Sequence, residues 1–441
     1  MTCGFFCTFV FIIITHSVKK VLLITYYFPP SGGAGVQRWL KMIKYLPQFG
    51  IEPVVLTVSE EYASYPQYDA SLLADVSSHT KVYRTKSTEV LSLYKKLSPK
   101  GEIPHTGFSN EPNPNFMQKV ARFIRGNLFL PDARKGWNAH AYKKAVELIA
   151  QEGIDTIITT SPPHSTQLVG LKLKQKFPHL TWVADLRDPW SNIFYQNKLY
   201  QTAFAQWLNK RYEKQVLANA DKVLTVSDDC RRLFESKITP KNPIVVLPNG
   251  YDPDDFINVP MQKQTHKFVL SYVGVFSEQY RIDVLIDALT HLAPKWADKV
   301  MLQFVGVVDQ ESKKKLQALP YQVEFVDYVL HKQAVAYMCN ADALLLCIPD
   351  IAHNKGILTG KLFEYLAARK PIVLLGPKDG DAATILERCE AGLCCDYQAD
   401  QLINILLSLL NGEFAVSQKP YQLAYSRQEI TRQLAHLLLN L

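Results

Sequence analysis

Short apolar runs that end in glycine- or proline-containing turns alternate with helix-like segments along this chain of 441 residues. The first example starts with an apolar run over Lys20–Tyr26, continues through Gly32-Gly-Ala-Gly35 and a helix-like segment, and ends with a second run over Pro53–Val58. A strand, a helix and a second strand in this order form a βαβ unit, in which the two strands are parallel. The pattern therefore predicts an α/β fold built on parallel sheets.

The alternation returns in the second half of the chain, and 441 residues are too many for one hydrophobic core. A polar stretch from Val259 to Lys267 separates the halves and has the composition of a linker. We expect two doubly wound, Rossmann-like domains that face each other across a cleft, over residues 19–258 and 259–425, and a last helix within residues 426–441. Further strands are expected at Thr156–Thr160, Thr181–Ala184, Lys222–Val226, Pro243–Leu247, Phe268–Val273, Val300–Val305, Gln322–Val326, Ala343–Ile348 and Pro371–Leu375.

The composition, 47% hydrophobic and 20% charged, is that of a globular protein and excludes a disordered one. A net charge of +8 favours anionic partners such as nucleotide diphosphates or a membrane surface, and we expect no nucleic acid among them. The eight cysteines include no Cys-x-x-Cys pair. We therefore expect reduced thiols in a cytoplasmic protein, with neither a metal centre nor a cofactor.

Residues 1–18 form an apolar leader that precedes the first βαβ unit. Its apolar run, Gly4–Ile14, is too short to span a bilayer. No Lys or Arg precedes the run, so the leader lacks the basic start of a signal peptide. Two interpretations stay open, namely a weak membrane anchor and a non-native extension from an upstream start.

A region rich in Pro, Asn, Lys and Arg, over about 85–134, interrupts the alternation. Within it, residues 116–128 can form an amphipathic helix with Lys119, Arg122 and Arg125 on one side. One interpretation is a surface helix whose apolar face packs on its own domain. The other is a basic helix on the anionic inner face of a membrane, which would make the protein peripheral. The apolar face consists of Phe116, Val120, Phe123, Ile124 and Leu128.

The segment from Thr359 to Pro371 has the pattern of a glycine-containing turn, a short helix and a proline break. The free backbone N–H groups at such a helix start, over Thr359, Gly360, Lys361 and Leu362, can bind a phosphate. Glu364 lies about one helical turn further on, where its carboxylate can accept two hydrogen bonds from a ribose diol. The segment could therefore bind both ends of a nucleotide diphosphate. The structural alternative is a capped helix with a solvated Glu364.

Two polar loops, Thr160-Ser-Pro-Pro-His164 and Asp185-Leu-Arg-Asp-Pro-Trp190, each follow a predicted strand of the first half. Parallel strands end at one edge of a sheet, so the loops should meet and could bind a polyol. Structural alternatives remain for both loops. His164 could simply neighbour a helix cap, and Arg187 and Asp188 could form an ion pair that holds their loop.

The glycines Gly32-Gly-Ala-Gly35 allow a phosphate to approach the backbone, or merely form a tight turn. Because Arg38 replaces the last glycine of Gly-x-Gly-x-x-Gly, a nicotinamide dehydrogenase with Glu60 as its ribose acid is a weak alternative.

In the second half, Arg281 follows a strand and could neutralise a leaving diphosphate, or be a surface residue at a helix start. Two Asp-x-Asp strings, Asp252-Pro-Asp254 and Asp379-Gly-Asp381, have the composition of loops or helix caps rather than metal sites.

Together these segments resemble the GT-B glycosyltransferases of family four, a large retaining group that builds bacterial capsules and lipopolysaccharides. The resemblance extends over roughly Lys19 to Leu441. Its most specific parts are Tyr26-Tyr-Phe-Pro-Pro-Ser-Gly-Gly, Asp185-Leu-Arg-Asp-Pro-Trp, Pro248-Asn-Gly-Tyr-Asp and Gly360-Lys-Leu-Phe-Glu-Tyr-Leu-Ala.

This resemblance implies an N-terminal acceptor-binding domain, a C-terminal domain that binds the nucleotide sugar, and a last helix that crosses back to the first domain. It also implies metal-independent transfer with retention. In that family's terms Glu364 would bind the ribose, Arg281 and Lys361 would meet the diphosphate, Gly33 would approach the donor phosphate, and His164 would lie near the donor sugar.

Among the remaining candidates we assign Asn249 to the donor side, Asp185 to the catalytic group, and Arg187, Asp188 and Trp190 to the acceptor side. The chain also departs from the family pattern at three positions. The first Glu of the family's Glu-x7-Glu motif is Gly356, the usual Gly-Arg after the first strand of the donor domain is Gly274-Val275, and the usual Lys nearby is Tyr280.

The leading hypothesis is therefore an enzyme that moves a sugar from a nucleotide-diphosphate donor to a glycan or lipid-linked acceptor in cell-surface polysaccharide synthesis. A sugar-nucleotide epimerase of the same fold is an alternative, for which Asp185 and Asp188 are the candidate acid and base. A non-catalytic member that binds a nucleotide or a glycan is another, because Gly356 removes a carboxylate from the motif.

Overall fold

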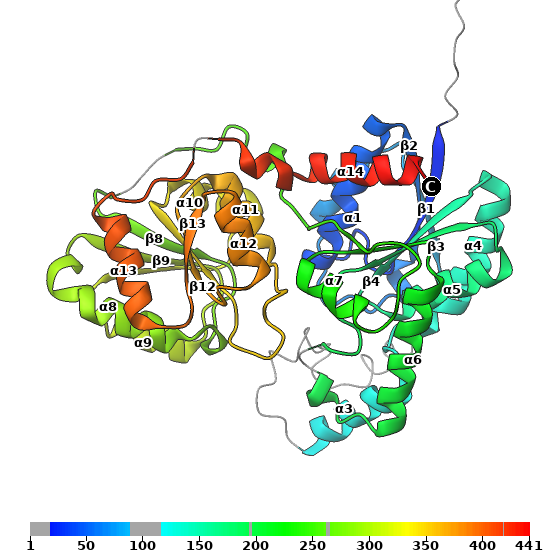
Figure 1. Ribbon diagram of the computed structural model, residues 1–441, viewed down its shortest axis with the longest axis horizontal. Helices are drawn as coiled ribbons and strands as arrows, with labels where there is room; N and C mark the ends of the chain where they lie inside the picture. The colour runs from blue at the N-terminus through cyan, green and yellow to red at the C-terminus, as the bar shows by residue number, and fades with distance from the viewer. Residues whose placement is uncertain (1–17, 89–115, 194–195, 262–264, 418) are drawn as a thin grey trace, which may run out of the picture.

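The computed structural model describes residues 18–88, 116–193, 196–261, 265–417 and 419–441. They form two α/β domains that lie side by side (Figure 1), each with one parallel sheet between layers of helices. The expected fold class, two doubly wound Rossmann-like domains, is confirmed. The apolar leader up to residue 17 and residues 262–264 of the expected linker lie outside the described residues.

The first sheet has seven parallel strands in the order β3-β2-β1-β4-β5-β6-β7. Chain order reverses between β1 and β4, and a crevice opens at the carboxyl ends of the strands on either side of such a reversal. Buried side chains of helices α4 to α7 pack on one face of this sheet, and those of α1 and α14 pack on the other. The strands are β1 (Lys19–Ile24), β2 (Ile51–Val58), β3 (Lys81–Thr85), β4 (Thr156–Ser161), β5 (Thr181–Leu186), β6 (Lys222–Thr225) and β7 (Val245–Val246), and the helices are α1 (Ala34–Tyr45), α4 (Asn138–Glu152), α5 (Ser165–Lys176), α6 (Ala203–Asn219), α7 (Asp228–Glu235) and α14 (Arg427–Leu439).

The second sheet has six parallel strands in the order β10-β9-β8-β11-β12-β13. Helices α10 to α12 pack on one face and helices α8, α9 and α13 on the other. The strands are β8 (Phe268–Val273), β9 (Val300–Val305), β10 (Gln322–Val326), β11 (Ala343–Cys347), β12 (Ile372–Leu375) and β13 (Gly392–Cys395), and the helices are α8 (Ile282–Trp296), α9 (Gln310–Gln317), α10 (His331–Asn340), α11 (Gly360–Ala368), α12 (Asp381–Arg388) and α13 (Ala399–Leu410).

The chain crosses between the domains twice, and the two crossings are bonded to each other. The backbone N–H of Tyr251 donates to the carbonyl of Tyr425 at 3.1 Å, and the N–H of Arg427 donates to the carbonyl of Tyr251 at 2.7 Å. Helix α14 then buries Ile430 and Leu434 against the first sheet (Figure 1, red). Because both crossings lie at one place, the domains have the connection that a hinge motion requires.

Helix α3 (Phe116–Leu128) forms over the expected residues. Its apolar side faces away from the body of the protein, and Arg122 of its basic side faces inward. The Phe116 side chain is 77% exposed, whereas Arg122 is only 4% exposed. The helix approaches the following segment at Gly126, where an added Cβ would lie 2.4 Å from the carbonyl oxygen of Leu199. The expectation that the apolar face packs on the domain is therefore wrong, and so is the expectation that Arg122 faces a membrane.

Candidate active site

A cavity of about 890 Å³ lies between the two domains, and residues of both line it. The first domain contributes loops that follow its strands, and the second contributes Gly356, Ile357 and Leu358, just before α11. Ligands of doubly wound folds bind at this end of the strands. The cavity brings together five of the expected site residues. They are Gly33, His164, Arg187, Asp188 and Asn249.

His164 supplies unused hydrogen-bonding atoms at the wall of this cavity. Its imidazole stacks on the indole of Trp190, with ring centroids 5.0 Å apart, and neither ring nitrogen has a hydrogen-bond partner. Burial lowers the pKa of the imidazole, which keeps the ring neutral. A neutral imidazole has one donor and one acceptor, so His164 can bind a sugar hydroxyl. Trp190, which was assigned to the acceptor side, does not line the cavity, and its ring contacts the imidazole of His164.

Arg187 ties its own loop to the end of β4 and to the start of α1 through carbonyl oxygens. Its guanidinium donates to Ser161 at 2.9 Å, to Gly35 at 2.8 Å and to Pro162 at 3.3 Å. No ion pair joins it to Asp188 in the described part of the chain, so the alternative of a loop-holding ion pair is wrong. Burial lowers the pKa of this guanidinium. The carboxylates of Asp185 and Asp188 oppose this shift, so they partly compensate the charge of Arg187 although its hydrogen bonds go to carbonyl oxygens.

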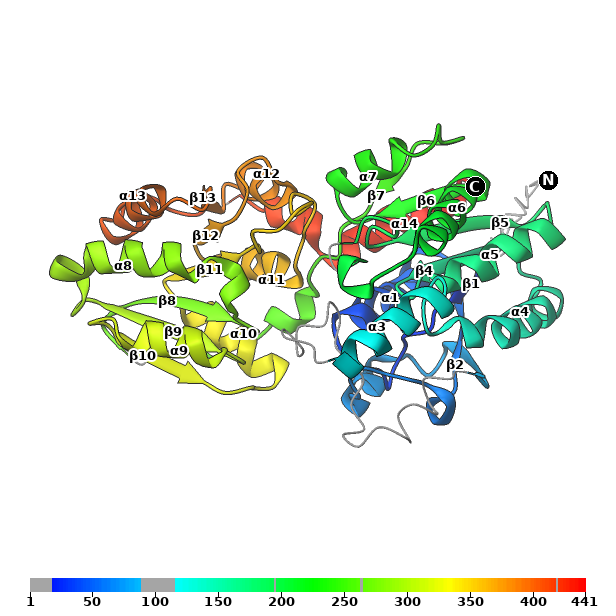
Figure 2. The ribbon, with the colours of Figure 1, turned by 90° about the horizontal axis from the view of Figure 1, so that it is seen from below.

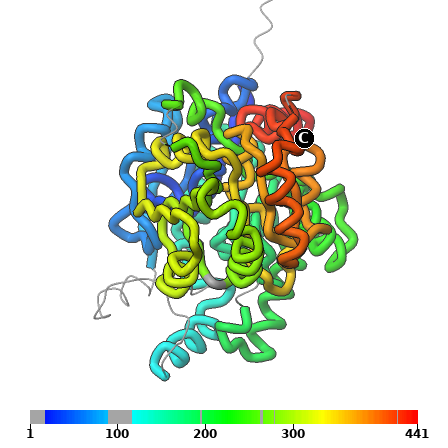
Figure 3. Tube along the Cα trace, turned by 90° about the vertical axis from the view of Figure 1, so that its left-hand side faces the viewer, coloured from blue at the N-terminus to red at the C-terminus, as the bar shows by residue number. Residues whose placement is uncertain are grey.

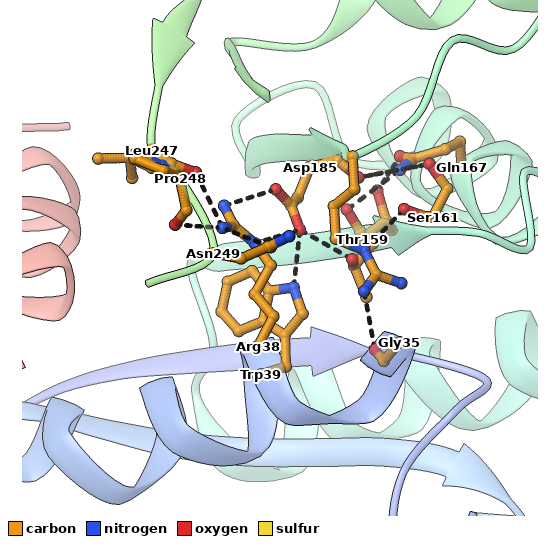
Figure 4. Close-up of polar contacts among 12 residues, drawn as sticks. Gly35, Arg38, Trp39, Thr159, Ser161, Gln167, Asp185, Leu247, Pro248 and Asn249 are labelled. Atoms are coloured by element: carbon orange, nitrogen blue, oxygen red, sulfur yellow. Dashed lines mark hydrogen bonds and ion pairs between the residues drawn. The ribbon is translucent and has the colours of Figure 1, made fainter. Parts of the chain in front are cut away.

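Asp185 occupies the centre of a buried polar network rather than the cavity (Figure 4). Its carboxylate accepts hydrogen bonds from Arg38 at 3.1 and 3.3 Å, from the Trp39 indole at 2.8 Å and from the Thr160 hydroxyl at 2.8 Å. The side chain is fully buried. A carboxylate with four donors and no access to substrate cannot act as an acid or base, so our assignment of Asp185 as catalytic is corrected to a structural role.

The same network fixes the positions of the Arg38 and Asn249 side chains. The Arg38 guanidinium donates to the carbonyl oxygens of Leu247 and Pro248 at 2.8 and 2.9 Å, and to the Asn249 side chain at 3.4 Å (Figure 4). Arg38 therefore ties the loop after β7 to Asp185 and to α1. Asn249 is positioned at the cavity by this bond.

Helix α11 begins beside the cavity with the residues expected to bind a diphosphate. The Lys361 ammonium donates to the Tyr272 hydroxyl at 2.9 Å and lies 4.8 Å from the centre of that ring. Its side chain crosses Gly274, where an added Cβ would come within 2.2 Å of the lysine Cε. No carboxylate pairs with Lys361 among the described residues, and burial lowers its pKa. At the N-terminal residue Thr359, the hydroxyl is buried without a partner.

Glu364 lies one turn into α11 and is partly buried. Burial raises the pKa of its carboxyl group, while the nearby His331 and Arg427 act in the opposite direction. Within the described residues no hydrogen bond to this carboxylate is formed by a protein group. Its acceptor capacity is thus available to a ligand. Leu358 is the last residue before α11 that lines the cavity, which Thr359, Gly360, Lys361, Leu362 and Glu364 do not line.

Gly356, which replaces the motif's first Glu, contacts the other domain. A Cβ at this position would lie 3.0 Å from the Ser227 hydroxyl and 3.0 Å from the Asp229 Cβ. Nearby, the backbone N–H of Asp229 donates to the Asp381 carboxylate at 2.8 Å. A side chain at position 356 would therefore crowd Ser227 and Asp229, and the glycine permits the close approach of the domains.

Arg281 does not face the cavity. Its guanidinium pairs with Asp283 and Asp350, both at 2.9 Å, and these carboxylates raise its pKa. The residue also adopts a left-handed backbone conformation, with a φ of 52°. Its charge is already neutralised, so the expectation that Arg281 faces the cleft as the main diphosphate partner is wrong.

The Asp-x-Asp strings each have partners inside the protein. Asp252 accepts from the Tyr45 hydroxyl and pairs with Lys41 at 2.8 Å, and these donors lower its pKa. Asp379 pairs with Lys355, and Asp381 accepts the N–H of Asp229 as described above. No cluster of three or more His, Cys, Asp or Glu suited to a metal occurs in the described part of the chain.

The charged cavity residues that the sequence analysis did not assign to the site include Arg125, Asp132 and Arg134. Asp132 accepts from the backbone N–H of Ser165 at 2.7 Å and from its hydroxyl at 2.8 Å, and so caps the helix that follows His164. Arg125 lies on the expected amphipathic helix, whereas Asp132 and Arg134 lie in the turn after it, where no periodic pattern marks them. The only available signal was the Pro-Asp-x-Arg string that is typical of a turn.

Two family models match the chain. Glycosyltransferase Family 4 matches residues 90–255, and Glycosyl transferases group 1 matches residues 254–427. No curated protein matches.

Solved structures match nearly the whole chain at low identity. Anabaena Alr3699/HepE in complex with UDP-glucose is 16% identical, with a TM-score of 0.59, over 96% of this chain and 100% of the other. The apo lipopolysaccharide outer core galactosyltransferase WaaB is 14% identical, with a TM-score of 0.57, over 96% and 99%. Sucrose-phosphate synthase from Thermosynechococcus elongatus is 17% identical, with a TM-score of 0.55, over 95% and 94%.

These structural likenesses establish a common fold, and the two family models together span residues 90–427. The chain therefore belongs to the GT-B glycosyltransferases of the family-four type.

Proposed function

We propose that the enzyme transfers a sugar from a nucleotide-diphosphate donor, with retention, to a glycan or lipid-linked acceptor in cell-surface polysaccharide synthesis. The observation that carries the proposal is the start of α11. There, among the described residues, the Lys361 ammonium has no carboxylate partner and the Glu364 carboxylate, about one turn away, has no protein donor. The structurally similar HepE is described in complex with UDP-glucose and with UDP, which supports a nucleotide sugar as the donor.

On the donor side, each end of the nucleotide diphosphate has a matching group. The diphosphate would meet Lys361 and the backbone N–H groups over Gly360 to Leu362, where the helix dipole also favours negative charge. The ribose diol would donate to Glu364. Lys361 has no acidic partner among the described residues, so binding of an anion would restore the charge balance that burial disturbs.

On the facing wall, the first domain would bind the transferred sugar and the acceptor. His164 offers its free ring nitrogens to a sugar hydroxyl. Gly33, which has a φ of 90°, lets the donor phosphate approach the backbone because it has no side chain. Arg187 and Asp188 line the same cavity and would contact an acceptor that carries charge and hydroxyl groups.

In this proposal the chemistry depends on electrostatics and positioning. As the bond from the sugar to the diphosphate breaks, Lys361 and the α11 N-terminus stabilise the negative charge that develops on the leaving phosphate. Asp185, the carboxylate first assigned to catalysis, is sealed in its own network and supplies no covalent nucleophile. Transfer with retention would then proceed by attack from the face that the leaving group vacates, without a covalent intermediate on Asp185. Closure about the paired crossings would exclude water.

The burial of Asp185 also weakens the epimerase alternative. It requires a paired acid and base in the cleft, and Asp185 is unavailable because its carboxylate is fully bonded and buried. Asp188 is then left without its proposed partner.

The ribose assignment is tested by Glu364→Ala. We expect the affinity for a nucleoside diphosphate to fall by about 1–3 kcal/mol, the loss for hydrogen bonds to a charged group. Isothermal titration calorimetry with UDP measures it, and Glu387→Ala on the exposed side of α12 is the matched control. If a folded Glu364→Ala protein binds UDP as tightly as the wild type, the carboxylate does not hold the ribose.

A second expected outcome concerns metals. Sugar transfer should continue at an undiminished rate after exhaustive treatment with EDTA, because the aspartates of both Asp-x-Asp strings are already bonded to protein donors. The assay is transfer with and without the chelator. Loss of activity that Mg²⁺ or Mn²⁺ restores would show that the diphosphate needs a cation.

A further inference from the structure

Two neighbouring helices expose an apolar surface on the underside of the first domain in the view of Figure 1. Helix α3 and the N-terminal end of α6 lie there together, as Figure 2 shows from below. In Figure 3, the cyan segment that contains α3 projects from the bottom of the molecule. We call this surface the α3–α6 platform. Its exposed side chains from α3 are Phe116, Met117, Val120, Phe123, Ile124 and Leu128, and those beside and on α6 are Tyr200, Phe204 and Trp207.

The buried sides of the two helices carry Arg122 of α3 and Asn209 and Glu213 of α6, and the apolar side chains point away from the body of the protein. Asn127 donates to the carbonyl of Tyr200 at 3.1 Å and accepts the N–H of Thr202 at 2.7 Å, which fixes α3 to the segment before α6. Arg122 is turned inward and is almost fully buried. Contiguous exposed patches of this kind mark a contact with a membrane or a protein.

The charges around the platform select a lipid surface as its occupant. Residues 116–131 and 196–212 contain six basic residues and no Asp or Glu. Of these, Lys119, Lys210 and Arg211 are exposed at the platform. The Arg211 guanidinium lies 5.3 Å from the centre of the Trp207 ring. Exposed aromatic rings next to cations suit the interface of an anionic bilayer, where rings lie among headgroups and cations meet lipid phosphates.

The platform also adjoins the catalytic cavity through α3. Arg125, on the same helix as Ile124, lines the cavity, as do Asn192 and Ile193 from the segment that leads to α6. Helix α3 thus has one side on the cavity and another on the platform. A substrate held at a membrane surface would be within the width of one helix, about 10–12 Å, of the cavity wall.

We propose that the α3–α6 platform inserts its aromatic and aliphatic side chains into the interface of an anionic lipid bilayer and so presents a lipid-linked acceptor to the cavity. The acceptor part extends the proposed function, whereas binding to lipid does not depend on it. The contact is peripheral. The apolar side chains provide the insertion, and the exposed Lys119, Lys210 and Arg211 provide attraction that salt screens.

The test is sedimentation of the full-length protein with vesicles of phosphatidylcholine and phosphatidylglycerol, and with vesicles of phosphatidylcholine alone. We expect binding to the mixed vesicles that weakens with salt. The double substitution Phe204→Ser and Trp207→Ser, and separately Phe123→Ser and Ile124→Ser, should each weaken it about tenfold, or about 1.4 kcal/mol. Leu73→Ser with Leu439→Ser is the matched control, because these exposed side chains lie in the same domain outside the platform.

Three outcomes would overturn the proposal. The first is that the wild type stays in the supernatant with both vesicle types. The second is that the platform variants sediment as fully as the control. The third is a wild-type dimer in analytical ultracentrifugation that the platform variants convert to monomers without any vesicle binding, since the platform would then join two copies of the chain. Uridine diphosphate affinity, measured on the same variants, should stay unchanged, so a failure here is distinguishable from a failure of the proposed function.

Discussion

Lys361→Met is expected to lower kcat for sugar transfer by about 10²–10³-fold, the usual effect of removing one donor to a charge that develops in the transition state. The methionine fills the space over Gly274 but removes the ammonium. KM should change less than kcat, because the charge on the leaving phosphate grows as the bond breaks. Initial rates at saturating and limiting donor separate the two constants.

Arg281→Ala is the comparison that decides which cation meets the diphosphate. Arg281 already pairs with Asp283 and Asp350, so its loss should change kcat far less than the loss of Lys361. The reverse order of effects would return the role to Arg281.

A pH profile provides an independent readout of the same assignment. Burial lowers the pKa of Lys361, so donor affinity should fall as pH rises, at a pH below the usual range of lysine. Burial raises the pKa of Glu364, so affinity should also fall on acidification, at a pH above the usual range of glutamate. Lys361→Met should abolish the alkaline limb alone.

Asp185→Ala is expected to lower the free energy of unfolding by about 3–5 kcal/mol, because it leaves the Arg38 guanidinium buried without its counter-ion. Both side chains are almost fully buried, and the bonds join α1, β4, β5 and the loop after β7. Urea denaturation followed by circular dichroism measures the loss.

Two further variants check that the loss comes from the orphaned charge. Asp188→Ala removes a neighbouring carboxylate that has no ion pair within the described residues, and should stay within about 0.5 kcal/mol of the wild type. Adding Arg38→Met to Asp185→Ala should restore part of the stability, because the unpaired cation is gone. A double variant less stable than Asp185→Ala would contradict this account.

The strands could be predicted where apolar runs are long and buried on both faces. The residues of β8 and β9 are those expected from the sequence, α3 has the expected bounds, and α14 lies within the expected residues 426–441. The edge strand β10 also has the expected bounds, although its residues are only half buried or exposed. The edge strands β3 and β13 were not predicted. In β3 the exposed Lys81 and Arg84 flank two partly buried apolar residues, and β13 has only four residues that begin with a glycine. Edge strands carry a weak signal because one side of each has no neighbouring strand.

The candidate site could be located from the sequence, but the partners of its side chains could not. Loops after parallel strands meet at one edge, which placed His164 and Arg187 in one cavity. The role of Asp185 depends on Arg38 and Trp39, which lie 147 and 146 residues away in sequence. No local pattern encodes such a pairing.

The orientation of α3 could not be predicted for a related reason. Periodicity distinguishes an apolar side from a basic side, and it did so correctly. Which side faces the body depends on contacts elsewhere, here the close approach at Gly126 and the bonds of Asn127. The common expectation that the apolar side packs inward therefore fails at this helix.

The central claim is tested most directly by the products formed from a panel of nucleotide sugars and a lipid extract of the source cells. One donor should yield a nucleoside diphosphate together with the sugar linked to an acceptor. Nuclear magnetic resonance should show the same anomeric configuration in the product as in the donor. A donor returned with a changed ring stereocentre, a linkage of inverted configuration, or tight donor binding without any turnover would each contradict the account.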